Sequence, residues 1–199
     1  MPVEQQQQVL DSEEPYWCLD PLDGTSNFVA GIPYFCVSLA LVENGKPSHG
    51  IVYDPARDEM FAAAYGKGAT LNGEKLAPRE VNLTLQQCMA VIDLKRLNKT
   101  FQSAIIQSPP FCSHRNFGAS ALEWSWLAAG RGHVYLHGGQ KLWDHAAGFL
   151  IFNEAGGHAR TMEGEIVFNN TLESRSVVAS LDNGLFQDWA AWVKKIAAQ

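Results

Sequence analysis

A run of short apolar segments separated by tight-turn signals is the feature that most constrains the fold. Residues 34–42 (YFCVSLALV) are followed by ENGK at 43–46, and SHGIVYDP returns at 48–55. Two more apolar segments follow at 59–68 and 70–76, and the second contains another Asn-Gly pair. Asn-Gly between apolar runs is a strong hairpin signal, because both residues tolerate the positive φ angles of a type I′ turn. The stretch therefore predicts an antiparallel, hairpin-rich sheet.

The rest of the chain alternates segments of strand and helix type. Apolar residues at helical spacing that end at Gly or Pro indicate helices, and short apolar runs between them indicate strands. The expected strands are 16–19, 88–94, 133–137 and 177–181, and the expected helices are 98–107, an amphipathic 120–130, 144–157 and 182–198. Helices that alternate with strands predict layers of helices packed against a sheet.

No internal repeat or long linker interrupts this pattern, which predicts one compact α+β unit over 1–199. Its parts are a polar, Gln-rich leader at 1–16, a strand-hairpin half at 17–94, and an alternating helix and strand half at 95–199. A loop, a short helix and a frayed end all remain open for the leader.

The charge balance favours a cation over a polyanion as partner. The chain has 15 Lys and Arg against 21 Asp and Glu, a net charge of −6, and no basic run. This argues against a nucleic acid or an anionic membrane surface as partner. There is no signal-peptide pattern and no apolar run of about 18 residues, so we expect a cytoplasmic protein.

The expected reduced core thiols are Cys18, Cys36, Cys88 and Cys112, which form no C-x-x-C pair.

The segment WCLDPLDGTSNF at 17–28 places two carboxylates on a sharp bend. Pro21 fixes its own φ and restricts Asp20 to an extended conformation, which allows Asp20 and Asp23 to converge. Two close carboxylates repel each other, and a shared proton or a hard divalent cation relieves that repulsion. The Leu22 carbonyl is a natural further oxygen ligand. The segment alone is also typical of an ordinary Asx turn between two strands.

Two further features extend this hypothesis. If a short helix begins at Gly24 and Thr25, its N–H groups form an anion site that suits phosphate. Asp144 falls where a helix of the second half is expected to begin, so its carboxylate would project toward whatever lies at that helix end, although a simple N-cap is the alternative.

Together, DPLDGTSNF (20–28) and WDHAAGFLIFNEAGG (143–157), with the hairpin region 50–76 between them, resemble the signatures of the inositol monophosphatase family. The resemblance covers nearly all of the chain from Trp17 onward. It implies an α+β fold, a layered α-β-α-β-α sandwich of the inositol monophosphatase/fructose-bisphosphatase type, here missing its N-terminal helices. It also implies a homodimer as the assembly to test.

The activity that the resemblance implies is Mg²⁺-dependent phosphomonoester hydrolysis by two-metal activation of water, inhibited by lithium in many members. The substrate would be a small phosphorylated metabolite, either an inositol monophosphate-like compound or a related sugar or nucleotide phosphate, with phosphatidylinositol phosphate biosynthesis as the associated process. The implied metal ligands are Asp20, the Leu22 carbonyl, Asp23 and Asp144. The implied catalytic residues are Asp20, which bridges the metals, and Thr25, whose hydroxyl positions the water. The implied substrate-binding residues are Gly24, Thr25, Ser120, His137 and Asp144.

The start of the chain departs from the family pattern. Family members carry a Gly-Glu-Glu motif roughly twenty residues before the first Asp of this loop, and it supplies a metal ligand and the residue that activates water. Glu4, Glu13 and Glu14 lie closer to Asp20 than that and in a different context. We expect an N-terminally shortened chain, begun at an internal methionine, with weakened metal binding and low or no turnover. The alternative is a catalytically impaired member or fragment with a binding or regulatory role, or none of its own.

The substrate-facing positions also depart from the pattern. His137 stands where the family has a Glu that receives substrate hydroxyls, and Ser120 offers a hydroxyl where the substrate would sit. Lys95, Arg96 and Arg115 are candidates for contacting a second anionic group. The alternatives are a satisfied strand-end histidine and solvated surface cations.

Overall fold

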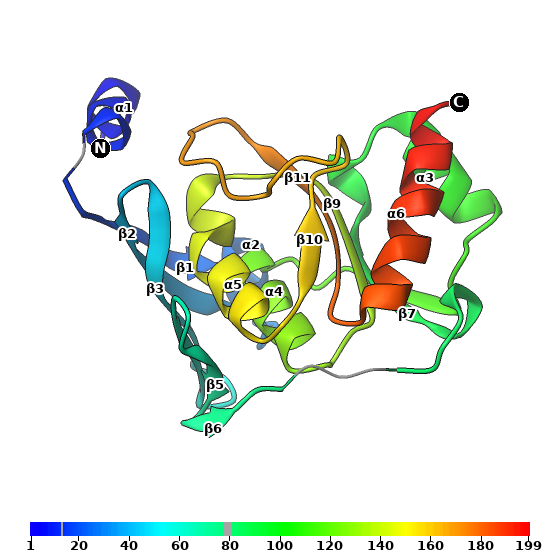
Figure 1. The fold of residues 1–199 in the computed structure, drawn as a ribbon, viewed down its shortest axis with the longest axis horizontal. Coiled ribbons are helices and arrows are strands. Elements are labelled where there is room, and N and C mark those ends of the chain that lie inside the picture. Colours follow the sequence, from blue (N-terminus) through cyan, green and yellow to red (C-terminus); the bar gives the residue numbers. More distant parts are fainter. Residues whose placement is uncertain (13, 78–80) are drawn as a thin grey trace.

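The computed structural model describes residues 1–12, 14–77 and 81–199. In these residues the chain forms four successive layers: a sheet, a pair of helices, a second sheet and a second pair of helices (Figure 1). This order confirms the predicted α+β class and the layered sandwich, of which a β-α-β-α series is present.

The first sheet is antiparallel and has the strand order β1-β2-β3-β4-β5-β6. Its strands are β1 (Tyr16–Asp23), β2 (Cys36–Glu43), β3 (Lys46–Asp54), β4 (Glu59–Ala64), β5 (Gly68–Leu71) and β6 (Glu74–Lys75). Asn44 and Asn72 have φ angles of 52° and 50°, and the glycine after each is also positive. The two Asn-Gly hairpins predicted from the sequence are therefore confirmed.

Side chains of the first sheet alternate between its two faces, except where the strand register shifts. Alternate residues such as Cys18, Ala40, Val52 and Phe61 are buried against the helices of the next layer. Their neighbours Trp17, Leu19, Ile51 and Met60 are exposed on the opposite face. The period of two expected for a strand thus assigns one face to the core.

The second sheet is mixed, in the order β10-β11-β9-β7-β8. Its strands are β7 (Met89–Asp93), β8 (Ser113–Arg115), β9 (Val134–Gln140), β10 (His158–Arg160) and β11 (Arg175–Ser180). Strand β7 is parallel to both of its neighbours, β8 and β9. The sequence grouping 17–94 placed this segment with the hairpins, and the structure places it in the other sheet. A continuous apolar run is typical of a strand buried on both faces in a parallel pairing. Strands β8 and β10 were not predicted, because three residues carry no periodic signal.

The helices are α1 (Val3–Asp11), α2 (Thr25–Val29), α3 (Lys99–Gln107), α4 (Ser120–Ala128), α5 (Leu142–Glu154) and α6 (Asn183–Ala197), with 3₁₀ turns η1 (Leu85–Gln87) and η2 (Leu94–Arg96). Of the three alternatives for the leader, the short helix is the one found. Asn98 and Asp182 cap α3 and α6 by accepting from the N–H groups of Phe101 and Leu185 at 3.0 and 2.9 Å. Within the described part of the chain, every helix is too short or too polar to cross a membrane.

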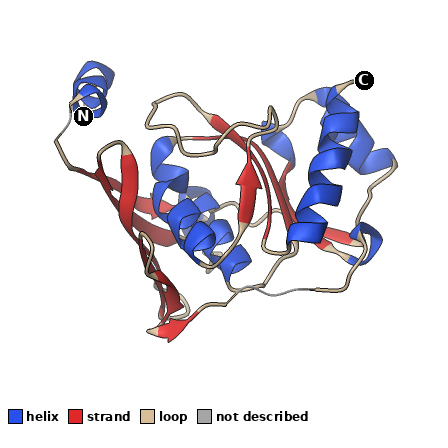
Figure 2. Ribbon diagram, in the orientation of Figure 1, coloured by secondary structure: helices blue, strands red, loops and turns tan. Residues whose placement is uncertain are grey.

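Helices α4 and α5 lie between the two sheets, and α3 and α6 cover the far side of the second sheet (Figure 2). The amphipathic pattern expected for 120–130 is wrong, because Leu122, Trp124 and Leu127 are fully buried and only Trp126 and the two ends of the segment keep partial exposure. A helix between two sheets must bury both of its faces, so it needs apolar residues almost all round.

Three of the four cysteines are core thiols, as expected. Cys18, Cys36 and Cys88 are buried, whereas Cys112 is exposed, and all four are free. Cys112 lies between the Pro109-Pro110 break and the edge strand β8, where no layer covers it.

Gly148 permits close packing of α5 on α4, and we expect Gly148→Ala to destabilise the fold by about 1–3 kcal/mol. A Cβ atom there would lie 2.7 Å from Trp124 Cβ and 3.0 Å from the Ala121 carbonyl oxygen. The matched control is Gly184→Ala on the exposed first turn of α6, where the nearest atom is the side-chain oxygen of Asp182 at 3.2 Å. Chemical denaturation should show stability unchanged or slightly raised in the control. Equal stability of the two variants would contradict the packing argument.

Candidate active site

A polar cleft of about 210 Å³ opens between the two sheets, where the end of β1 meets the carboxyl ends of β7 and β9. Ligand sites in α/β proteins commonly lie at the carboxyl ends of parallel strands. The cleft brings together the metal, catalytic and substrate-binding residues that the family resemblance implied, namely Asp20, Leu22, Asp23, Gly24, Thr25, Ser120, His137 and Asp144.

The bend at the end of β1 comes from an interruption of its pairing with β2. Asp20 pairs with Ser38 and Asp23 with Cys36, and the register shifts between these two pairs. Pro21 has no N–H to donate to the ladder, so the chain bulges there. The Oδ1 atom of Asp20 accepts from the N–H of Leu22 at 3.0 Å, which holds its carboxylate at the bend.

Asp23 is the deepest acid of the loop. Its Oδ2 atom accepts from the N–H of Ala121 in the first turn of α4 at 2.6 Å, which joins the loop to the central helix layer. Burial is the main cause that raises the pKa of Asp23 to about 8; the charges of Asp144 and Asp20 act in the same direction, and the hydrogen bond from Ala121 acts against them.

The short helix expected after the bend is present. It is α2, and Gly24 is its N-cap with φ of 89°. A Cβ atom on Gly24 would lie 2.9 Å from the Tyr34 carbonyl oxygen, so this position requires glycine for both its angle and its space. Thr25 is exposed, and its hydroxyl donates to the Leu22 carbonyl at 3.0 Å. No side chain caps α2, so the N–H groups of its first turn are available to a ligand.

Asp144 reaches the same cleft from the central helix layer. Helix α5 begins at Leu142, and the Asp144 Oδ2 atom accepts from the N–H of Lys141 at 2.9 Å. Asp144 is therefore a first-turn residue that helps to cap the helix and also lines the cleft. Burial raises its pKa above the ordinary value, and the charge of Asp20 adds to the effect.

The three acids suit a hard cation by their chemistry. Asp20, Asp23 and Asp144 each use one oxygen in a backbone hydrogen bond and share one cleft. Carboxylate and carbonyl oxygens are the ligands that Mg²⁺ prefers, and Mg²⁺ needs few of them because it keeps several waters. In the described residues no three His, Cys, Asp or Glu side chains lie close enough together to hold a metal ion by themselves. The donor set fits an open magnesium site better than a protein-enclosed one.

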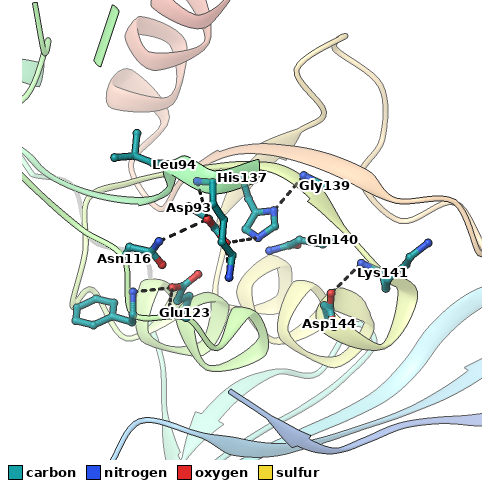
Figure 3. A network of polar contacts seen from close by, with 12 residues as sticks. Asp93, Leu94, Asn116, Glu123, His137, Gly139, Gln140, Lys141 and Asp144 are labelled. Atoms are coloured by element: carbon teal, nitrogen blue, oxygen red, sulfur yellow. Dashed lines mark hydrogen bonds and ion pairs between the residues drawn. The ribbon is translucent and has the colours of Figure 1, made fainter. Parts of the chain in front are cut away.

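The second sheet contributes the opposite side of the cleft (Figure 3). Asp93 on β7 and His137 on β9 are register partners, and His137 Nε2 lies 3.5 Å from Asp93 Oδ2. Burial alone would raise the pKa of Asp93, but His137 and Lys95 lower it below the ordinary value. Ser120, the first residue of α4, lines the cleft from the helix layer.

A buried hydrogen-bond network supports the floor of the cleft. Glu123 accepts from the N–H groups of Phe117 and Gly118 at 3.1 and 3.0 Å and from the Tyr135 hydroxyl at 2.9 Å. Gln140 donates to the Tyr135 hydroxyl at 2.6 Å. Burial raises the pKa of Glu123 above its ordinary value. The network holds Phe117 and Gly118 in place just before α4, beside the cleft.

Sequence reasoning missed Asp93 and Glu123, both of which line the cleft. A signal existed for each: Asp93 ends an apolar strand, and Glu123 is an acid inside an otherwise apolar helix.

The other charged candidates divide by position. Lys95 and Arg96 line the cleft, whereas Arg115 on the edge strand β8 does not. Glu4 and Glu14 also do not line it, and Glu13 lies outside the described residues.

The fold and the cleft define a layered α+β protein with an acidic, oxygen-rich site between its sheets. A model of the inositol monophosphatase family matches residues 2–197 of the chain. A Nus factor SuhB of Xylella fastidiosa is 39% identical over 155 residues, covering 74% of this chain and 55% of the relative. An inositol-1-monophosphatase of Bacillus subtilis is 34% identical and covers 87% of this chain and 67% of the relative.

A solved structure of the extragenic suppressor protein suhB from Bartonella henselae superposes with a TM-score of 0.82 at 32% identity, covering 93% of this chain and 72% of that one. The chain belongs to the inositol monophosphatase family. It spans a little over half of the Xylella relative's length.

Proposed function

We propose that this cleft is the active site of a Mg²⁺-dependent phosphomonoesterase that hydrolyses a small phosphorylated metabolite. The observation that carries the proposal is the meeting of Asp20, Asp23 and Asp144 with the start of α2 in one cleft. Acids that suit magnesium and backbone donors that suit phosphate are the two requirements of metal-assisted phosphate hydrolysis.

The roles follow from the position of each group. Asp20, Asp23, Asp144 and the Leu22 carbonyl would hold magnesium, which when bound lowers the pKa of a coordinated water and stabilises developing negative charge. Gly24 and Thr25 would hold the phosphate oxygens through their N–H groups.

The residues of the loop also prepare the reacting groups. The Thr25 hydroxyl is oriented by its hydrogen bond to the Leu22 carbonyl, and its oxygen would accept from the attacking water and aim it. Ser120 would donate to the substrate from the start of α4. The hydrogen bonds from Leu22, Ala121 and Lys141 would keep the three carboxylates in place before the substrate arrives.

Metal binding provides a test that does not require turnover. We expect the chain to bind Mn²⁺, as a paramagnetic substitute for Mg²⁺, and Asp144→Asn to weaken that binding by at least about tenfold. Asparagine keeps an oxygen that can accept from the N–H of Lys141, so the start of α5 is preserved. The control is Asp188→Asn on the exposed side of α6, which should bind Mn²⁺ as the parent chain does. Electron paramagnetic resonance of free Mn²⁺ measures both, and equal affinity of the two variants would contradict the proposal.

A binding or regulatory role is the second candidate, and one observation favours it. Relatives 33–40% identical to this chain are named Nus factor SuhB, and one is named inositol-1-monophosphatase. The net charge of −6 predicts no affinity for nucleic acid. That stays a prediction, which filter binding of the chain to single-stranded RNA at physiological salt would test. A folded, metal-binding chain that releases no phosphate from any ester would favour this candidate.

The expected homodimer and the cytoplasmic location also stay predictions. Sedimentation of the chain would test the first, and its distribution in fractionated cells would test the second.

A further inference from the structure

The two ring nitrogens of His137 are both engaged within the protein. The N–H of Gly139 donates to Nδ1 at 3.1 Å, and Nε2 faces the Asp93 carboxylate at 3.5 Å. Because Nδ1 accepts, the ring proton lies on Nε2 and is directed at Asp93. The side chain is only 4% exposed. His137 therefore offers no free acceptor to a substrate hydroxyl.

The Asp93 carboxylate is also occupied. Its Oδ1 atom accepts from the N–H of Lys95 at 3.1 Å and from Asn116 at 3.5 Å, while Oδ2 faces His137. Asp93 is 7% exposed at its side chain. Both oxygens of the acid on this side of the cleft, Asp93, therefore make contacts within the protein (Figure 3).

The groups that remain for a ligand on this side are cations. Lys95 and Arg96 are exposed and line the cleft, and Lys95 Nζ lies 3.8 Å from Asp93 Oδ2. Their turn, η2, packs closely against β9, because a Cβ atom on Gly138 would clash with the Arg96 carbonyl oxygen. Only glycine allows this approach, so the two cations leave the backbone at a fixed place beside His137.

We propose that Lys95, which Asp93 holds, and Arg96, whose backbone lies against Gly138, bind a second negatively charged group of the substrate. The substrate class is then a phosphomonoester whose alcohol part carries a further phosphate or a carboxylate, in preference to an uncharged polyol. The inference rests on the proposed phosphatase function of the same cleft. In the reaction, water oxygen bonds to phosphorus, the ester P–O bond breaks, and a water proton goes to the alcohol oxygen. The second charged group stays on the released alcohol.

Three-carbon esters test the inference: glycerol 3-phosphate, 3-phosphoglycerate and propane-1,3-diol bisphosphate. We expect the parent chain to have a higher kcat/KM for 3-phosphoglycerate and propane-1,3-diol bisphosphate, the two esters with a second charged group, than for glycerol 3-phosphate, whose alcohol part is uncharged. The charged-to-neutral ratio is kcat/KM for either of the first two divided by kcat/KM for glycerol 3-phosphate. Lys95→Ala and Arg96→Ala should each lower this ratio by about tenfold. The matched control is Arg115→Ala, which removes an exposed arginine outside the cleft and should leave the ratio unchanged. Thermal melting checks that every variant is folded. A preference for the carboxylate or for the bisphosphate assigns the charged group, and either one supports the inference.

A second variant, His137→Glu, places an acceptor and a negative charge on this side of the cleft. It is expected to shift the ratio toward glycerol 3-phosphate. Two results would overturn the inference and leave the proposed phosphatase function intact. One is a ratio that is the same in the parent chain and in both Lys95→Ala and Arg96→Ala. The other is a preference of the parent chain for glycerol 3-phosphate.

If none of the three esters is hydrolysed, the activity measurement gives no support to the proposed function, and binding then decides the inference. Titration calorimetry of the same esters in Mg²⁺ would support it if the charged esters bind more tightly and lose about tenfold in affinity in Lys95→Ala and Arg96→Ala. Equal binding of all three esters, or binding of none, would overturn it.

Discussion

Asp20→Asn is expected to lower Mg²⁺-dependent phosphate release, which we expect to be low already in the parent chain, by at least about 100-fold, equivalent to about 2.7 kcal/mol of transition-state stabilisation. Asp20 lies at the bend of β1, and its one structural hydrogen bond is from the N–H of Leu22. The asparagine carbonyl can accept that bond, so the substitution removes the negative charge and one oxygen of the proposed metal ligand while keeping the shape. The measurement is kcat/KM for a phosphomonoester at saturating Mg²⁺.

The control for this prediction is Asp188→Asn, which neutralises an exposed carboxylate on α6 outside the cleft. It should hydrolyse the ester at the parent rate. Turnover of Asp20→Asn within a few fold of the parent, with an unchanged melting temperature, would show that the acids of this cleft do not hold the catalytic metal.

Trp124→Ala is expected to destabilise the fold by about 3–5 kcal/mol, because the residue fills the layer between the two sheets. Trp124 is fully buried, with Tyr135 and Phe152 at ring-centroid distances of 5.2 and 5.1 Å. Its indole N–H donates to Gln140 at 3.0 Å, and Gln140 belongs to the network beneath the cleft. The substitution therefore leaves both a cavity and an unpaired amide.

The matched control is Trp17→Ala, which removes a side chain that is 63% exposed on the outer face of the first sheet. Its effect should stay within about 0.5 kcal/mol. In a domain of this size, each kcal/mol shifts the melting temperature by about 2–4 °C, so Trp124→Ala should melt about 6–20 °C lower. Similar melting temperatures of the two variants would contradict a central role for the Trp124 layer.

Elements with a strong local signal were predictable from the sequence. The Asn-Gly hairpins of the first sheet have turn residues that impose their geometry without help from distant contacts. The ends of α3 and α6 were predicted to within a residue, because Asn98 and Asp182 cap them locally. The sheet to which 89–93 belongs could not be predicted, since its partner strand β9 lies more than forty residues away in the chain.

The acids of the candidate site illustrate the same division. Pro21 restricts the backbone and Gly24 permits a left-handed turn in any fold, so the sequence predicted that Asp20 and Asp23 would stand on a bend. The resemblance of 143–157 to a family signature added Asp144, which no local signal connects to the bend.

The charges and hydrogen bonds of the site residues depend on the tertiary structure alone. His137 was expected to face the substrate, and only the register of β7 with β9 shows that Asp93 and Gly139 occupy its ring nitrogens. Lys95 and Arg115 look alike in the sequence, yet one lines the cleft and the other stands on an edge strand. The sequence by itself determined the bend, the hairpins and the helix caps, because these depend on a few neighbouring residues. Only the tertiary structure decided which side chains share the cleft, because that depends on long-range pairing and burial.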